Sequence, residues 1–376
     1  MSNLVKYINS LPDTSFAAVQ KHFVVRNVIV KEEGSRYLLL PNQSKEQIYA
    51  HETPEFQQAI EQAVGTILTK DTNTICCFGF PKTTEVPSSA EAGAGAAAGP
   101  YLVSKYVPGT LIRAYWTQSG WRISTTAVMN AYDSYWGSEK SFGEMVADSL
   151  GGKHFAQATE LVSELREHCS YQFILQQSES SPPVLHHIGT YDNINHKYVS
   201  QVLTNYPPIM TVTCDTLEDI RALLAFNAHG VIFYPQAAEA DQAPRYKMLT
   251  STFSAHRALL GNTPDLYLRF IECWTEGTTA QLMQKHPQFV PIGAAVMNGV
   301  NQAVVNLHEA YMKRFVKKEV SMAGVNYFYR PFISQLHSLY HQKKYEKTTY
   351  DTVHKLLLGS HPKVILFLLK GAQLLI

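Results

Sequence analysis

The feature that most constrains the fold is a change in hydrophobic periodicity along the chain. Short apolar runs of strand length, such as residues 110–116 and 171–176, recur through the first two thirds of the sequence. From Thr263 onwards the apolar residues follow helical spacing and strand signals are few. A sheet-rich front and an all-helical back predict two domains: an α+β domain built on antiparallel sheets at 1–280 and a helical C-terminal domain at 281–376.

Several elements within this outline have clear local signals. The strands at 110–116 and 121–125 flank residues 117–120 (TQSG), a turn sequence that predicts a hairpin. Thr263 followed by Pro264 predicts the N-cap and the first residue of a helix. Periodicity predicts further helices at 54–63, 141–150 and 156–168, and further strands at 24–30, 37–40, 74–80, 101–104, 171–176 and 230–234.

A run of small residues interrupts the predicted α+β domain. Residues 87–100 read PSSAEAGAGAAAGP and contain no large apolar side chain. Such a segment offers nothing with which to build a core. We predict a mobile surface loop at 87–100.

Composition excludes little. Hydrophobic residues make up 45% of the 376 residues and the formal net charge is +1, so any basic surface must come from local clustering. The five cysteines have neither a CxxC pair nor zinc-type spacing, which favours free thiols in a reducing compartment. The N-terminus has no apolar signal core, and the apolar run at 364–369 is far shorter than the roughly 20 residues of a membrane span. We expect an intracellular protein or one enclosed in a virion, without a membrane partner.

Five segments follow one another in an order typical of one enzyme superfamily. They begin at Gly65 (GTILTKDTNTICCFGF), Ser104 (SKYVPGTLIRAYW), Tyr171 (YQFILQQSES), His229 (HGVIFY) and Arg245 (RYKMLTSTFSAHRALLGNTPDLYLRF). Over residues 60–275 the chain thus resembles the covalent nucleotidyltransferases, and among them the RNA ligases of bacteriophages and large DNA viruses. The resemblance implies a nucleotidyltransferase fold for the first domain.

The resemblance also implies a particular chemistry. In these ligases the lysine of a K-x-D-G motif attacks the α-phosphate of ATP to form lysyl-AMP, while carboxylates hold magnesium and later lysines neutralise the phosphates. Aligned on Gly109, the lysine position falls on Tyr106, and Lys105 lies one residue too early. Because a shift of one residue turns a strand side chain to the opposite face, Lys105 is a candidate nucleophile only if a bulge precedes Gly109. The alternative is a lysine that faces solvent.

Most other catalytic positions of the family hold different residues in this chain. The aspartate, the phosphate-binding arginine and two carboxylates are replaced, in that order, by Pro108, Val64, Ile174 and His229. The basic pair of the fifth motif is kept as Arg245 and Lys247. The resemblance therefore implies a nucleotide-binding set of Tyr106, Gly109, Arg245 and Lys247 in a site that has lost much of its chemistry.

A second candidate site lies in the helical domain. Residues 311–347 combine eight basic side chains with several aromatic ones. Lysine and arginine bind phosphates and rings stack on unpaired bases, so Lys313, Arg314, Lys317 and Lys318 are candidates for binding single-stranded nucleic acid or RNA. The alternative is a solvated helical face above core aromatics.

One histidine pair has helical spacing. His337 and His341 are four residues apart, but no third ligand accompanies them, so we expect a surface or packed pair and no metal site. Glycine-rich phosphate loops, G-x-S-x-G elbows and dinucleotide-binding fingerprints are absent from the sequence.

Three functions remain open from the sequence. The first is a catalytically degenerate RNA-ligase-fold protein of a large DNA virus, which acts by binding nucleic acid or as a structural virion protein. The second is an active ATP-dependent RNA ligase that uses ATP, magnesium and Lys105. The third is a capsid or assembly protein without either activity.

Overall fold

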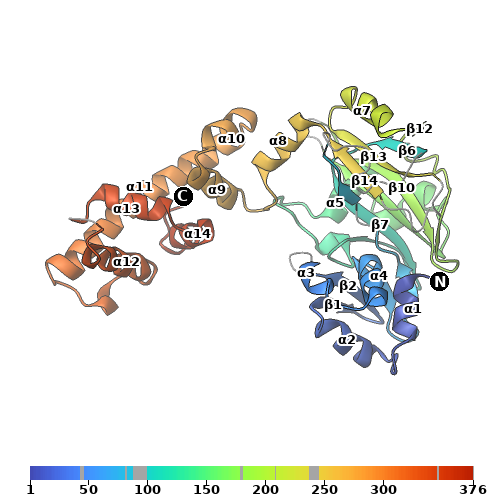
Figure 1. Cartoon of the computed structure of the whole chain (residues 1–376), viewed down its shortest axis with the longest axis horizontal. Helices are drawn as coiled ribbons and strands as arrows, with labels where there is room; N and C mark the ends of the chain where they lie inside the picture. The colour runs from blue at the N-terminus through green and yellow to red at the C-terminus, as the bar shows by residue number, and fades with distance from the viewer. Residues whose placement is uncertain are drawn as a thin grey trace. The chain divides into compact units, whose positions relative to one another are not determined.

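The computed structural model describes residues 1–42, 46–80, 83–87, 100–177, 181–207, 209–236, 245–344 and 347–375. Its contacts form two compact units, Met1–Ser254 and Ala255–Ile376 (Figure 1). The first unit contains three sheets and the second is helical, so the predicted α+β class with antiparallel sheets followed by a helical region is confirmed. Apart from its two end residues, the loop predicted at 87–100 lies outside the described residues.

The boundary between the units precedes the one expected from the sequence. Contacts divide the chain after Ser254, whereas periodicity placed the division after residue 280. The difference arises from helix α9 (Leu266–Glu276). Its Phe270 and Ile271 are buried in the helical core with residues of α11 (Phe289–Tyr311) and α14 (Pro362–Gly371). Local periodicity could not show on which core this helix packs.

The N-terminal part of the first unit is a four-stranded antiparallel sheet in the order β1-β2-β3-β4. Its elements are α1 (Asn3–Asn9), α2 (Phe16–Val24), β1 (Val28–Glu33), β2 (Arg36–Pro41), α3 (Glu46–Tyr49), α4 (Pro54–Ala63), β3 (Ile67–Thr69) and β4 (Ile75–Cys77). Helix α4 has the bounds predicted for it, and the side chain of Thr53 caps it by accepting the N–H of Phe56. The strand predicted at 24–30 was wrong in its first residues, because α2 continues to Val24 and β1 begins only after Asn27 turns the chain with φ of 62°.

The second sheet has the order β11-β10-β9-β7-β8 and is antiparallel throughout. Its elements are β7 (Thr110–Thr117), β8 (Gly120–Thr125), α5 (Phe142–Ser149), α6 (Thr159–Val162), β9 (Cys169–Gln176), β10 (Val184–Asp192) and β11 (Lys197–Val199). The predicted β7–β8 hairpin is confirmed. The helix predicted at 156–168 was wrong except at α6: residues 155–157 form a 3-10 turn, and beyond α6 the N–H of Arg166 donates to the Tyr171 hydroxyl at 2.7 Å.

The third sheet has the order β12-β6-β13-β14-β5. Its elements are β5 (Thr83–Glu85), β6 (Tyr101–Lys105), β12 (Thr211–Cys214), α7 (Leu217–Ala225), β13 (Gly230–Pro235) and β14 (Arg245–Leu249). The edge strand β5 runs parallel to β14, and the remaining pairs are antiparallel. Helix α7 covers one face, where Ile220 and Leu224 are buried with Val103 and Phe233. The side chains that alternate with these point to the opposite face.

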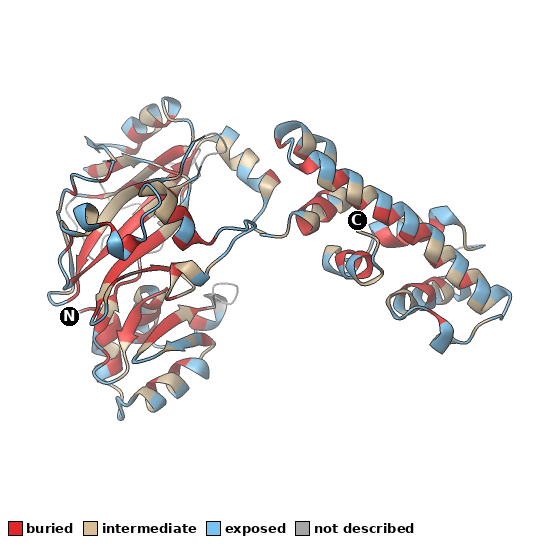
Figure 2. Cartoon of the chain, turned by 180° about the vertical axis from the view of Figure 1, so that it is seen from behind, coloured by how far each residue is buried: buried red, intermediate tan, exposed pale blue. Residues whose placement is uncertain are grey.

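The second sheet has helix α5 on one face, and its other face is turned toward the other two sheets. Helix α5 covers one side of this sheet, with Phe142 and Met145 buried against Phe173. On the other side, Tyr115 of β7 is buried with Leu38 of the first sheet. Figure 2 shows buried residues concentrated in the strands of this unit.

The helical unit consists of short helices around the 23-residue α11. Its elements are α8 (Ser251–Leu260), which spans the boundary, α9, α10 (Thr279–Lys285), α11 (Phe289–Tyr311), the π-helical turn η4 (Met312–Val316), the 3-10 turn η6 (Tyr327–Tyr329), α12 (Arg330–His341), α13 (Tyr350–Leu358) and α14 (Pro362–Gly371). The N-cap predicted at Thr263 was wrong. The side chain of Asp265 caps α9 instead, by accepting the N–H of Leu268 at 3.1 Å.

Candidate functional site

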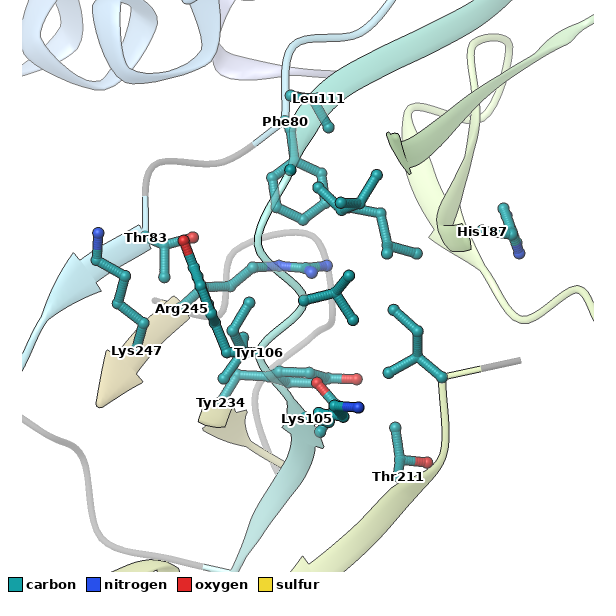
Figure 3. A pocket seen from close by; sticks show the side chains of 17 residues that line it. Phe80, Thr83, Lys105, Tyr106, Leu111, His187, Thr211, Tyr234, Arg245 and Lys247 are labelled. Carbon is teal, nitrogen blue, oxygen red and sulfur yellow. The ribbon is translucent and has the colours of Figure 1, made fainter. Parts of the chain in front are cut away.

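A pocket of about 300 Å³ lies between the second and third sheets of the first unit (Figure 3). The second sheet contributes mainly apolar side chains, and the third sheet contributes the cationic and hydroxyl groups. Lining residues of the second sheet are Leu111, Ile174, His187 and Ile188, and those of the third are Thr83, Ser104, Lys105, Thr211, Ile232, Tyr234, Arg245 and Lys247. Connecting segments add Phe80, Tyr106, Val107, Gly109 and Ile209.

The pocket brings together all five residues of the first unit that the sequence singled out. Strand register explains how: Ile232 of β13 pairs with Ser104 on one side and with Lys247 on the other. Arg245 lies two residues before Lys247 on the same face of β14. Tyr106 and Gly109 follow β6 in the connection to β7.

Gly109 is required by close packing. A Cβ at this position would lie 2.4 Å from the carbonyl oxygen of Leu175 on β9. Only glycine lets the β6–β7 connection pass this close to the second sheet, so Gly109 helps to close the pocket between the sheets.

Arg245 is held in an aromatic cage, which we define as Phe80, Tyr198 and Tyr234. The Cζ atom of its guanidinium lies 4.6, 5.1 and 5.2 Å from the centres of these three rings. In Figure 3 its side chain extends from β14 below the Phe80 ring. Rings of this kind attract a cation while partly removing its water. A guanidinium carries planar N–H donors that match phosphate oxygens in pairs.

Lys247 has an acidic neighbour. Its Nζ lies 3.1 Å from Oε2 of Glu85, and its side chain is 17% exposed against 49% for Glu85. The two residues are directly paired because β5 runs alongside β14. The charge of this lysine is therefore partly compensated within the protein.

Lys105 lies at the end of β6 with an exposed side chain. It pairs with Val231, and the ladder continues without a register shift when the N–H of Tyr106 donates to the carbonyl of Gly230 at 2.9 Å. By strand alternation, the side chain of Lys105 therefore starts on the same face of the sheet as the buried Val103, and that of Tyr106 on the same face as Ser104. Both side chains nevertheless line the pocket.

Of the two adjacent histidines on β10, His187 lines the pocket and His186 lies beside it. Burial lowers the pKa of His187 to about 4, and its Nε2 is 3.0 Å from the Thr190 hydroxyl. Burial also lowers the pKa of His186, and the charge of Lys105 lowers it further. His187 is therefore a neutral imidazole at pH 7. The bulge between His187 and Gly189 is where Ile188 enters the pocket lining.

The residues that replace catalytic groups of the ligase family do not lie together in this structure. Ile174 lines the pocket, whereas the ring of His229 packs 5.0 Å from that of Phe253. Val64 precedes Gly65, whose carbonyl accepts a hydrogen bond from the buried Arg113. Among the described residues, no group of three or more His, Cys, Asp or Glu side chains has the arrangement of a metal site.

Several residues in or beside the pocket were not found from the sequence. Phe80 lines the pocket, Tyr198 contacts Arg245 and Glu85 pairs with Lys247, and the three lie on different segments with no motif of their own. Tyr234 could have been found, because alternation along the predicted strand at 230–234 puts it on the same side as Ile232.

The nucleic-acid candidates of the second unit lie on and just after η4, the turn that follows α11. Lys313, Lys317 and Lys318 are exposed. The Cζ of Arg314 lies 5.2 Å from the centre of the Phe315 ring. Tyr327, on η6, is 67% exposed.

The histidine pair of α12 is packed against an aromatic ring. The Nε2 atoms of His337 and His341 are 3.0 Å apart, and His337 stacks on Phe315 with ring centres 3.8 Å apart. Burial and the charges of His341 and Arg314 lower the pKa of His337.

The sequence is similar to proteins of two viruses. No protein-family model matches the sequence. The chain is 21% identical over 312 residues to the "Immediate-early protein ICP-46 homolog" of Invertebrate iridescent virus 6, covering 72% of this chain and 67% of that protein. The protein of the same name from Invertebrate iridescent virus 3 is 21% identical over 213 residues, and the match covers 55% of this chain and 48% of that protein.

Solved structures to which the chain is similar include ATP-dependent ligases. An archaeal ATP-dependent RNA ligase (form 1) is 13% identical with a TM-score of 0.43, and covers 76% of this chain and 82% of its own. A putative ATP-dependent DNA ligase from Aquifex aeolicus is 13% identical with a TM-score of 0.40, and covers 79% and 81%. These scores are too low to assign the chain to a family. Within the described ranges, no helix is long and apolar enough to cross a membrane.

Proposed function

We propose that the pocket between the second and third sheets binds a nucleotide through its phosphates, and that the chain acts by binding without forming a covalent nucleotide adduct. The observation that carries this proposal is the lining of the pocket. Lys105, Arg245 and Lys247 of the third sheet line it together with apolar side chains of the second. Phosphates require charge-assisted donors, and a base requires flat or apolar surfaces.

The volume and neutrality of the remaining lining fit this ligand class. About 300 Å³ is at the lower end of small-molecule pockets, which run from roughly 300 to 1,000 Å³. The neutral His187 adds neither charge nor repulsion, so the cationic groups set the preference for an anion. We further infer that the chain is a ligase-fold protein of viral origin, supported by its motif order and its viral relatives.

The absence of nucleotidyl transfer is proposed from the strand register. A covalent adduct of the ligase type needs an amine that faces the α-phosphate. Tyr106 occupies the position that the resemblance gives to the nucleophile, and Lys105 pairs with Val231 in a regular ladder. Active ligation remains the second candidate function, because Lys105 also lines the pocket.

One experiment separates the two candidates. We expect the purified chain to bind ATP in equilibrium dialysis, and its intact mass to stay unchanged after incubation with ATP and either magnesium or manganese. An AMP adduct that Lys105→Ala abolishes and Lys70→Ala leaves in place would establish the active ligase instead. Failure to bind ATP or any other nucleoside triphosphate would refute the nucleotide site.

A nucleic-acid surface on the helical unit is a further proposal with its own observation. Exposed lysines at the end of α11 and the exposed ring of Tyr327 belong to the same helical unit. Ammonium groups bind phosphates, and an exposed ring provides a stacking surface for an unpaired base. RNA or single-stranded DNA is the partner that this combination favours.

Reversing two of these charges tests the surface. We expect Lys317→Glu with Lys318→Glu to weaken binding of a single-stranded oligonucleotide and to flatten its salt dependence, by about 0.7 in the logarithmic slope for each phosphate that the variant no longer neutralises. Fluorescence anisotropy at several salt concentrations measures both. The matched control reverses Lys285 and Lys363, two exposed lysines of other helices in the same unit. Equal effects in test and control would show only a general charge effect and would exclude a local surface.

A further inference from the structure

Glu85 and Lys247 form an ion pair at the pocket that the nucleotide proposal leaves unused. Glu85 lies on β5 and Lys247 on β14, and the two strands pair in parallel with these residues opposite each other. Its Nζ–Oε2 distance of 3.1 Å brings a carboxylate directly against one of the cations that line the pocket.

We propose that Glu85 is an internal counter-ion of the pocket, which occupies Lys247 until a ligand phosphate replaces it and thereby selects for highly charged polyphosphates. This inference rests on the proposed nucleotide site and specifies its ligand class. A ligand with one phosphate gains little by competing with a carboxylate that is already in place. A chain of phosphates, held by Arg245 at one point, presents a higher local charge to Lys247.

The burial of the two partners suits such an exchange. Lys247 is mostly buried, so its attraction for any anion is screened only weakly by salt. Glu85 is about half exposed, so its carboxylate can return to water without a large desolvation penalty. The exchange therefore replaces one partner of Lys247 by another and leaves no buried charge alone.

Arg245 differs from Lys247 in this respect. Its guanidinium contacts the rings of the aromatic cage, and within the described residues it forms no ion pair. A ring stabilises a cation without supplying a negative charge that a phosphate must displace. We therefore assign first contact with a phosphate to Arg245 and charge selection to the Glu85–Lys247 pair.

Glu85→Gln tests the inference with ATP, AMP and inorganic tripolyphosphate as probes. We expect affinity for ATP and tripolyphosphate to rise roughly threefold to tenfold, because the amide neither neutralises Lys247 nor repels phosphate. AMP, which competes least well with the carboxylate, should gain by a larger factor than ATP, so that the preference for ATP over AMP becomes smaller. Isothermal titration calorimetry at fixed ionic strength measures all three affinities.

Two further variants make the result specific. Glu218→Gln removes an equal charge from an exposed carboxylate that pairs with Arg221 on α7, across the sheet from the pocket, and should leave every affinity unchanged. In a Lys247→Met background, Glu85→Gln should lose its gain, since there is no longer an ammonium to release. A matching thermal unfolding curve shows that each variant is folded.

The possible outcomes are distinguishable. If wild type binds ATP and Glu85→Gln binds it no better, the counter-ion inference is overturned and the nucleotide site stands. If Glu85→Gln still raises the affinity for ATP in the Lys247→Met background, the inference is also overturned, because the carboxylate of Glu85 then acts by general repulsion of phosphate. If neither protein binds ATP or tripolyphosphate, the proposed function fails and the inference fails with it.

Discussion

Substituting Arg113 with alanine is expected to lower the free energy of unfolding of the first unit by about 3 to 5 kcal/mol. The side chain of Arg113 is fully buried in β7. Its Nη1 donates to the carbonyl of Gly65 and its Nη2 to that of Thr125, which ties the chain between α4 and β3 to the end of β8. Alanine leaves both carbonyls without these donors and leaves a large cavity.

Gly65 shows how closely the chain packs around this guanidinium. Its φ is 74°, and a Cβ there would lie 2.9 Å from Nη1 of Arg113 and 2.8 Å from the carbonyl of Thr126. Lysine in place of Arg113 should recover only part of the stability, because a single ammonium lacks the planar fork that reaches both carbonyls.

Denaturant unfolding measures this effect in a Trp274→Phe background. The remaining tryptophans, Trp116, Trp121 and Trp136, then report on the first unit alone. Lys140→Ala is the control, since the side chains of Lys140 and its partner Asp148 are 60% and 38% exposed and the loss should stay within about 0.5 kcal/mol. A loss below about 1 kcal/mol for Arg113→Ala would mean that the buried guanidinium does not hold the two segments together.

Arg245→Ala is expected to weaken ATP binding by about 10-fold to 100-fold, equivalent to about 1.5 to 3 kcal/mol for a hydrogen bond to a charged group. The guanidinium is the cation placed among the three rings of the aromatic cage. Its removal takes away the paired donors for phosphate and leaves the rings without the cation they surround. Arg245→Lys keeps the charge and should show a smaller loss.

Calorimetric titration of ATP into each variant gives the measurement. Arg221→Ala serves as the control for binding, because α7 covers the face of the third sheet that is turned away from the pocket. Unchanged affinity in Arg245→Ala, with binding intact in the control, would locate the nucleotide elsewhere on the chain. The nucleotide proposal would then have to be abandoned for this pocket.

Local signals in the sequence determined a large part of the fold. The helix α4 was predicted with its observed bounds because Thr53 and Pro54 form a complete start signal, and the β7–β8 hairpin because its turn lies between two alternating strands. Alternation and periodicity also predicted that a helical region follows the sheet-rich one, but not where the two units divide. Such features depend on residues close together in the chain, which is why sequence alone was sufficient.

The motif order likewise indicated which side chains of the first unit to watch. Lys105, Tyr106, Gly109, Arg245 and Lys247 were selected from short segments of the chain, and they line one pocket. Their role in binding a nucleotide stays a prediction. The sequence could not show that Lys105 continues a regular ladder, because the pairing with Val231 joins distant segments.

Tertiary structure decided the remaining features, since each depends on partners far apart in sequence. Thr263 and Asp265 are both good capping residues, but Asp265 also pairs with Lys370 of α14 at 2.7 Å, which favours the later helix start. The aromatic cage draws its rings from three separate segments, and the pairing of β5 with β14 sets Glu85 against Lys247. Arg113 is buried where the carbonyls of Gly65 and Thr125, from two other segments, converge on its guanidinium. A residue's own chemistry is local, but its burial and its charged partners are fixed by how the sheets pack.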